Sequence, residues 1–230
     1  MAAATLFLWL GRSQVGPAYK TAVTISGLVC AIAAYHYFRI FESWNAAYGV
    51  ADGVVTATSV AFNDAYRYVD WLLTVPLLLV ELVLVMRLSQ DETVSKSIKL
   101  GSAAALMVVL GYPGEIATTR AIWGTLSAIP FAYVMFELFK GLGDSIERQP
   151  ESVRGLIKKA RLLTFASWGF YPIVYMIPYT NLSGGAVVTG VQVGYTIADI
   201  IAKVGVGLLI YIIAVRKSEI EYGAQARAAV

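Results

Sequence analysis

The sequence is short of charge and of cysteine. Only 14% of its 230 residues are charged, 58% are hydrophobic, and the mean hydropathy is +0.66. A soluble globular domain would carry about a quarter charged residues, so this class is excluded and an integral membrane protein is indicated. The one cysteine, Cys30, lies in an apolar run. A single cysteine excludes an intrachain disulfide, and we expect this one to be inert packing.

Several other features are missing. Residues 1–10 contain no basic segment and no convincing cleavage site, so we expect no cleavable signal peptide. The chain has no repeats, no low-complexity tract and no separate soluble region, which predicts a single domain over residues 1–230. The basic residues lie at the edges of apolar runs, so the net charge of +3 does not indicate nucleic-acid binding. We expect no metal site.

Long apolar runs make up most of the chain. A helix of about 20 apolar residues can cross a membrane. Such runs lie at 19–41, 66–88, 97–113, 121–140, 156–178 and 187–215. Residues 1–10 reach only about 15 Å as a helix, and we expect them to be the cytoplasmic half of a first helix that begins before this chain. The sequence therefore predicts an all-α membrane protein with seven transmembrane helices, the first truncated, and its 42–65 connection could form a short β-hairpin over Val54–Phe62, after Asp52-Gly53.

The basic residues predict the orientation of this bundle. Fourteen of them lie on one side, and only Arg39 and Arg120 lie on the other. The basic side comprises the segments 11–20, 87–99, 140–161 and 216–227, and the opposite side comprises the connections 42–65, 111–120 and 179–190. Cytoplasmic loops are enriched in Lys and Arg, so we expect the C-terminus in the cytoplasm and the N-terminus outside.

Two basic residues, Arg67 and Lys203, lie inside the predicted spans. A protonated lysine within a bilayer costs about 2.5–3.5 kcal/mol even on lenient insertion scales, so Lys203 must be paired, neutralised or chemically used. Asp199 lies four residues earlier, on the same helix face. The amine is therefore either half of a structural ion pair or a covalent attachment point with its counterion.

A polar stripe runs along the predicted helix 66–88. At about 100° per residue, Arg67, Asp70, Thr74 and Glu81 share one face, and Glu81 lies about 16 Å from Asp70 towards the cytoplasm. Two carboxylates at different depths indicate two stations of a proton path; the alternative is that they only satisfy polar groups of neighbouring helices. We expect Asp70 to be ionised beside Arg67 and Glu81 to be neutral among leucine and valine.

His36, the only histidine, lies near the outer end of the run 19–41, at a depth compatible with Asp70. It is either a core residue or a partner that delays protonation of this carboxylate.

Aromatic residues gather in the run 156–178. Trp168 and Tyr171 are three residues apart and share a face, and Pro172 introduces a bend. This stripe is either core packing or, together with Trp71, the wall of a slot for a flat conjugated ligand.

Three motifs together resemble the microbial (type 1) rhodopsins, seven-helix proteins with retinal bound to a lysine of the last helix. The motifs are Arg67-Tyr-Val-Asp-Trp-Leu-Leu-Thr-Val-Pro76, Trp168-Gly-Phe-Tyr-Pro172 and Asp199-Ile-Ile-Ala-Lys-Val-Gly205. The resemblance implies that Lys203 forms the retinal Schiff base, with Asp70 and Asp199 as its counterion. It also implies that the polyene is lined by Trp71, Leu78, Trp168, Tyr171 and Pro172, and that Tyr37 and Tyr171 hydrogen-bond to Asp199.

Within that family, Asp70, Thr74 and Glu81 are similar to the Asp-Thr-Glu set of bacterial outward proton pumps. The resemblance implies that Asp70 accepts the proton, Glu81 donates one from the cytoplasmic side, and His36 and Arg67 adjust the affinity of Asp70. A chloride pump would lack the carboxylate at Asp70, and a bacterial sodium pump would show Asn, Asp and Gln at the three positions.

We therefore expect a light-driven outward proton pump of the bacterial plasma membrane, surrounded by lipid, and not an enzyme. The family implies a homo-oligomer, a trimer or a pentamer. Two alternatives stay open: a sensory photoreceptor that signals to a partner, and a retinal-free transporter in which Lys203 and Asp199 form a structural pair.

Further segments resemble the xanthorhodopsin branch, some members of which bind a carotenoid antenna. They are His36-Tyr-Phe-Arg39, Asn63–Trp71 and Gly194–Asp199. Gly124 stands where rhodopsins without an antenna often carry tryptophan, so it either opens a window for a hydroxylated or keto-carotenoid or is ordinary helix packing. Leu78, in place of glutamine, implies green absorption. The 179–190 connection has no carboxylate, so the paired-glutamate release group of bacteriorhodopsin is expected to be absent.

Overall fold

The computed structural model describes residues 1–116, 118–179 and 184–228, and this part of the chain is mostly helical. The helices are α1 (Ala2–Gly11), α2 (Lys20–Ala47), α3 (Ala65–Met86), α4 (Gln90–Gly111), α5 (Pro113–Ile116), α6 (Arg120–Phe136), α7 (Gly143–Glu147), α8 (Glu151–Tyr175), α9 (Gly185–Asp199) and α10 (Val206–Ala228). Two π-helical segments continue them: Glu137–Gly141 extends α6, and Ile200–Gly205 joins α9 to α10. Short 3₁₀ turns lie at Arg12–Gln14, Pro17–Tyr19 and Ile177–Tyr179.

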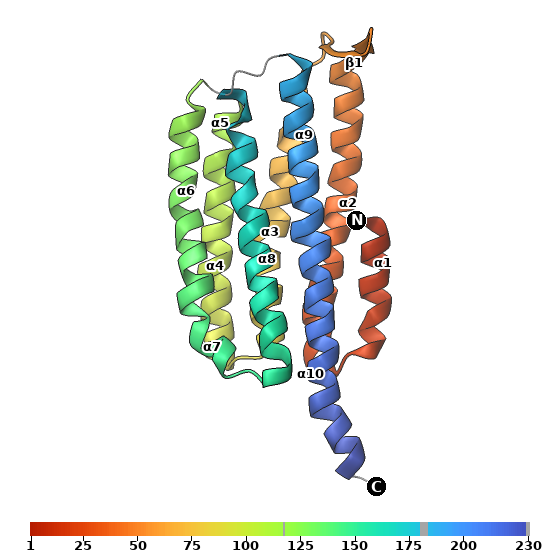
Figure 1. The fold of residues 1–230 in the computed structure, drawn as a ribbon, viewed down its shortest axis with the longest axis vertical. Coiled ribbons are helices and arrows are strands. Elements are labelled where there is room, and N and C mark those ends of the chain that lie inside the picture. The colour runs from red at the N-terminus through yellow and green to blue at the C-terminus, as the bar shows by residue number, and fades with distance from the viewer. Residues whose placement is uncertain (117, 180–183, 229–230) are drawn as a thin grey trace.

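The long helices stand side by side in a bundle (Figure 1). Because α9 and α10 form one rod, the described chain contains seven rods: α1, α2, α3, α4, α6, α8 and α9–α10. The predicted all-α, seven-helix fold is confirmed, and each of the six predicted full spans coincides with a rod. In Figure 1, α1 covers about half the height of the bundle, and α10 extends beyond it.

Several helices extend past the apolar runs that predicted them, and α4 shows why. It begins at Gln90, although the apolar run begins only at residue 97. Ser89 Oγ accepts a hydrogen bond from Glu92 N at 3.3 Å and donates one to Glu92 Oε2 at 3.1 Å. This capping arrangement starts the helix in polar sequence, so hydropathy alone places its beginning too late.

The bundle has apolar side chains outside and charges inside. Ile98 and Ile129 are 64% and 65% exposed, whereas Asp70, Glu81 and Lys203 are at most 1% exposed. Five described helical stretches are long and apolar enough to cross a membrane: Pro17–Ala47, Ala65–Met86, Gln90–Glu115, Arg120–Glu147 and Gly185–Gly223. Such a distribution suits a protein whose solvent is lipid, where ionisable groups face the interior.

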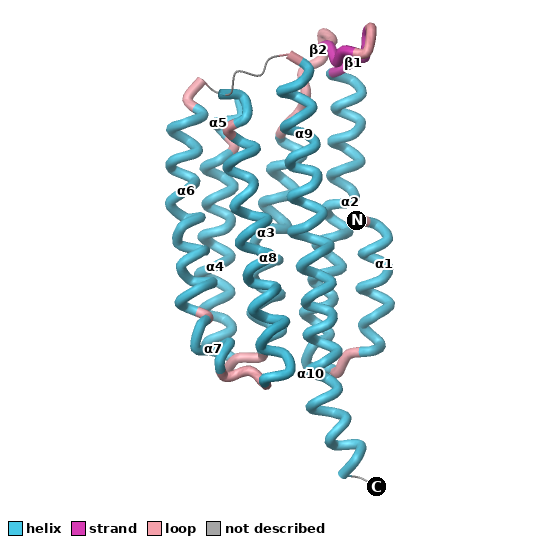
Figure 2. Tube along the Cα trace, viewed as in Figure 1, coloured by secondary structure: helices cyan, strands magenta, loops and turns pink. Residues whose placement is uncertain are grey.

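A hairpin forms within the 42–65 connection, as predicted (Figure 2). Strand β1 (Tyr48–Ala51) pairs antiparallel with β2 (Val54–Ala57). Asp52 and Gly53 both have positive φ, 52° and 76°, as a two-residue hairpin turn requires. The second strand ends at Ala57, five residues before the predicted end at Phe62.

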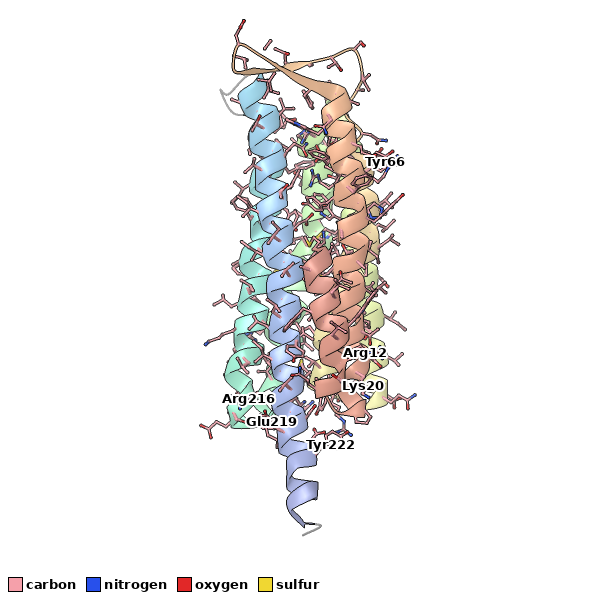
Figure 3. The ribbon with its side chains drawn as sticks, turned by 90° about the vertical axis from the view of Figure 1, so that its right-hand side faces the viewer. Arg12, Lys20, Tyr66, Arg216, Glu219 and Tyr222 are labelled. Carbon is pink, nitrogen blue, oxygen red and sulfur yellow. The ribbon has the colours of Figure 1, made fainter. Side chains whose placement is uncertain are left out.

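The two ends of the bundle differ in charge. Figure 3 shows Arg12, Lys20 and Arg216 near the end from which α10 projects, and Tyr66 towards the opposite end. This arrangement agrees with the asymmetry of basic residues in the sequence.

Candidate functional site

Lys203 lies in the middle of the bundle, on the π-helical segment between α9 and α10. Its side chain is 1% exposed. The Nζ atom lies 2.5 Å from Asp70 Oδ2 and 3.0 Å from Asp199 Oδ1. The sequence analysis did not predict this π-helical segment, because its composition is that of an ordinary apolar helix. Such π-bulges are frequent at functional sites. The buried amine therefore has two carboxylate partners, one from its own helix and one from α3.

Asp199 is held by three further donors from three helices. Tyr37 OH donates to Oδ2 at 2.7 Å, Trp71 Nε1 donates to Oδ1 at 3.1 Å, and Tyr171 OH donates to Oδ1. Both tyrosine hydrogen bonds implied by the resemblance are present, and that of Trp71 is an addition. Hydrogen bonds to the charged form of a carboxylate stabilise that form. These three hydrogen bonds therefore favour the ionised form of Asp199.

Asp70 is bonded differently. Its Oδ2 contacts Lys203, but its Oδ1 has no hydrogen-bond partner among the described residues. His36 Nδ1 lies 4.0 Å from this free oxygen and 2.9 Å from Ile32 O. His36 is therefore adjacent to Asp70, as the sequence predicted, without being hydrogen-bonded to it. Thr74 donates to the backbone oxygen of Asp70 at 2.8 Å rather than to its carboxylate.

Arg67 corrects one expectation from the helical stripe. It is 1% exposed, and its Nη1 lies 3.4 Å from Tyr37 OH, while its Nη2 donates to Gln192 Oε1. In the described part of the chain it has no ion pair with Asp70. Side chains of a helix point towards its N-terminus, so Arg67 reaches away from Asp70 and towards the hairpin end of the bundle.

Glu81 lies further along α3 than Asp70, away from the hairpin end of the bundle. It is fully buried, and neither carboxyl oxygen has a hydrogen-bond partner among the residues described. Ser26 and Cys30 of α2 lie near Glu81, and the Ser26 hydroxyl, which could bond to it, instead donates to Ala22 O at 3.3 Å. An ionised carboxylate without partners is strongly disfavoured in such a place, which supports the prediction that Glu81 is neutral.

A plug of polar groups follows beyond Glu81, at the end of α3. Lys217 Nζ donates to Val85 O at 3.2 Å, to Met86 O at 3.0 Å and to Gln149 Oε1 at 2.7 Å. Lys217 is 4% exposed. These bonds satisfy the last carbonyl groups of α3 and close the bundle on this side.

A cavity of about 320 Å³ lies next to Lys203. Its lining includes every residue that the sequence predicted for the polyene pocket: Trp71, Leu78, Trp168, Tyr171 and Pro172. Gly124 and Lys203 also line it. An amine at an apolar, aromatic slot is what a long conjugated aldehyde requires, so these residues fit retinal.

Gly124 and Tyr175 pack against each other in the lining of this cavity. A Cβ atom at Gly124 would lie 3.0 Å from Tyr175 Cε1, and one at Gly114 would lie 1.7 Å from Tyr175 Oη. The hydroxyl of Tyr175 donates to Gly111 O at 3.2 Å. Glycine at position 124 therefore allows the close packing of α6 against Tyr175 and also lines the cavity.

The sequence analysis missed a polar cluster at the hairpin end of the bundle. Glu115 accepts hydrogen bonds from Tyr68 OH at 3.0 Å and Tyr195 OH at 3.1 Å, and it pairs with Arg120 at 2.8 Å. Gln192, the partner of Arg67, was missed too. Polar residues in apolar helices were the available signal, but their partners depend on how the helices are placed.

Comparisons with known proteins give the family. Residues 1–217 match the family model of bacteriorhodopsin-like proteins. The green-light absorbing proteorhodopsin of gamma-proteobacterium EBAC31A08 is 31% identical over 219 residues, which cover 94% of this chain and 82% of that protein. The solved structure of xanthorhodopsin, described as a light-driven ion pump with dual chromophore, is 54% identical, with a TM-score of 0.88 over 95% of this chain and 89% of that one. A thermophilic rhodopsin structure is 47% identical, with a TM-score of 0.89 and the same coverage. This chain belongs to the bacteriorhodopsin-like family, the microbial rhodopsins.

Proposed function

We propose that the protein is a light-driven outward proton pump of the bacterial plasma membrane, with protons as its cargo. One observation carries the proposal: the buried Lys203 amine lies 2.5 Å from Asp70, and a second buried carboxyl group, Glu81, lies further along the same helix, away from the hairpin end. The relatives include a proteorhodopsin and a light-driven ion pump, which supports the same conclusion.

Retinal bound to Lys203 Nζ as a protonated Schiff base would supply the absorption of light and a light-dependent change in the proton affinity of that nitrogen. Trp71, Leu78, Trp168, Tyr171 and Pro172 would hold it, because they line the cavity beside Lys203. Leu78, where other members carry glutamine, supports green absorption.

The protein's own groups give the proton a direction. Asp199 accepts hydrogen bonds from Tyr37, Trp71 and Tyr171, so a proton there would displace donors that favour its anion. Asp70 has a free oxygen and only Lys203 as a close partner, so the proton at Lys203 Nζ moves to Asp70. His36, 4.0 Å from the free oxygen, adjusts the affinity of Asp70 for this proton.

Glu81 then returns a proton to Lys203 from the cytoplasmic side. Its burial without partners keeps it neutral until the nitrogen has lost its proton. The basic residues at the end from which α10 projects support a cytoplasmic C-terminus and hence outward transport.

Illumination of cells that express the protein tests this function. We expect the external medium to acidify, an uncoupler to abolish the change, and Lys203→Ala to lack both the visible absorption band and the acidification. A slow photocycle without any pH change would favour a sensory photoreceptor instead. A band that survives in Lys203→Ala would favour a retinal-free transporter with a structural ion pair.

We also propose a carotenoid antenna beside Gly124. The support is that Gly124 lines the cavity and that xanthorhodopsin has a dual chromophore. Added hydroxylated or keto-carotenoid should give an energy-transfer band in the excitation spectrum, and Gly124→Trp should lose it while keeping the retinal band. Gly114→Ala, which also disturbs Tyr175 but does not line the cavity, is the matched control.

A further inference from the structure

The first turns of α8 carry positive charge on the outer surface of the bundle, in a place that the proposed pump does not use. α8 begins at Glu151, at the end of the bundle from which α10 projects (Figure 1). At about 100° per residue, Arg154, Lys158 and Arg161 share one face of this helix, and Phe165 continues the same stripe. The side chains of Arg154 and Lys158 are 34% and 45% exposed, so this face lies at the molecular surface.

These three cations share one carboxylate, that of Glu147 on α7. Arg154 Nη1 lies 3.3 Å from Glu147 Oε2, and Lys158 Nζ lies 2.6 Å from Glu147 Oε1. Both carboxylate oxygens are thereby used. Arg161 makes no hydrogen bond or ion pair within the described chain, and its Nε is buried without a partner. Three positive charges face one negative charge, so the cluster keeps an excess of positive charge, and Arg161 is the unpaired member.

The surroundings of Arg161 are aromatic and face outwards. Its guanidinium carbon lies 4.6 Å from the centroid of the Phe139 ring, on the π-helical extension of α6. Phe139 packs edge-on against Phe165 of α8, with 5.4 Å between the ring centroids. Phe139, Phe165 and Leu162 are 38%, 44% and 58% exposed. A ring below the guanidinium plane contacts its face and leaves the N–H groups at its edge free for an acceptor.

The depth of Arg161 places its charge near the lipid headgroups. Arg161 lies ten residues after Glu151 and fourteen before Tyr175, about 15 Å and 21 Å along the helix axis. The hydrocarbon core of a bilayer is about 30 Å thick, so the backbone of Arg161 lies inside its border. Side chains of a helix point towards its N-terminus, and the guanidinium therefore reaches back to the border, where lipid phosphates lie.

We propose that one anionic phospholipid binds at this boundary of α6 and α8, with its phosphate on Arg161 and an acyl chain along the rings of Phe139 and Phe165. A guanidinium binds a phosphate through two parallel N–H···O hydrogen bonds. The excess positive charge favours phosphatidylglycerol, with its net negative charge, over phosphatidylcholine, whose choline group adds a positive charge. The proposal does not depend on the pump function.

Lipid retention measures this binding. The protein is placed in nanodiscs that contain equal amounts of phosphatidylglycerol and phosphatidylcholine, released into detergent and analysed by native mass spectrometry. We expect one phosphatidylglycerol per protomer, and about tenfold less in Arg161→Gln, the loss expected for one charged hydrogen-bonding partner. Lys159→Gln is the matched control and should retain the lipid, because it removes the same charge from the opposite face of α8.

Three results would overturn the proposal. One is equal retention of the two lipids by wild type, and another is an equal loss in Arg161→Gln and Lys159→Gln. The third comes from thermal unfolding in detergent: phosphatidylglycerol should raise the melting temperature of wild type, and an equal rise with inorganic phosphate would indicate a free anion instead of a lipid.

Arg161→Lys decides the matter if Arg161→Gln does not fold. It keeps the positive charge but lacks the paired donors of a guanidinium. Weaker retention of phosphatidylglycerol than in Lys159→Gln would support the contact between guanidinium and phosphate, and retention equal to that of wild type would refute it.

Discussion

The two halves of the bundle interior, on either side of Lys203, are built in opposite ways. On the hairpin side, Tyr37 OH bonds to Asp199 and to Arg67. The Arg67 guanidinium also lies over the ring of Tyr195, whose hydroxyl donates to Glu115. On the other side, Glu81 has no hydrogen-bond partner among the described residues, and Lys217 bonds to the end of α3 beyond it. The half with hydrogen-bonded polar groups, the connected half, can pass a proton on. The other half, the apolar half, holds a proton on Glu81 until the central site has lost one. We propose that the direction of transport follows from this difference.

Removing Asp70 should have the largest effect on this comparison. In Asp70→Asn the acceptor 2.5 Å from Lys203 is lost, so we expect proton transfer to slow by about a hundredfold or more and pumping to stop. Flash absorption spectroscopy measures the transfer. Asp52→Asn, in the exposed hairpin turn, should behave as wild type, and pumping that persists in Asp70→Asn would show that another group accepts the proton.

Glu81→Gln should break the opposite half. The first transfer should keep its rate, because Glu81 does not contact Asp70 or Lys203, whereas the return of the proton should slow at least about tenfold. A small permeant weak acid should restore the rate at which the proton returns to Lys203, because it can carry protons through the apolar half. Glu92→Gln, an exposed carboxylate at the same end, is the control. A normal rate of proton return in Glu81→Gln would mean that protons cross the apolar half without Glu81.

Stability should respond with opposite signs in the two halves. Asp199→Asn removes a charge that Lys203 and three hydrogen bonds stabilise, and it should lower the free energy of unfolding by about 3 kcal/mol. Glu81→Leu removes a buried polar group without partners and should raise it by about 1 kcal/mol. Unfolding in detergent measures both, and equal signs would contradict the comparison.

The smallest effect is expected outside both halves. Arg39 and Glu42 form a surface pair at 3.4 Å, with side chains 39% and 48% exposed. Glu42→Gln should change the free energy of unfolding by less than about 0.5 kcal/mol and leave proton transfer unchanged. A larger change would mean that this pair participates in the hydrogen-bonded groups of the connected half.

The sequence predicted what depends on periodicity within one helix. The spacing of Asp199 and Lys203, and the stripe of Asp70, Thr74 and Glu81, follow from 3.6 residues per turn. The same reasoning failed for Arg67, because sharing a stripe does not say in which direction a long side chain extends.

Contacts between helices were harder to predict. The family resemblance implied the bonds of Tyr37 and Tyr171 to Asp199. Nothing in the spacing indicated that Glu115, which is 47 residues from Tyr68 and 80 from Tyr195, would meet both of them. Such contacts depend on the relative placement of α3, α5 and α9, which hydropathy does not give.

Time-resolved infrared spectroscopy of the two carboxyl groups tests the central claim most directly. After a flash, the C=O band of protonated Asp70 should rise first, and the band of protonated Glu81 should disappear only afterwards, with Asp70→Asn and Glu81→Gln assigning the two bands. This order means that the proton leaves through the connected half, and that another proton enters through the apolar half, by way of Glu81. Loss of the Glu81 band before the Asp70 band appears, or no Asp70 band at all, would contradict the account.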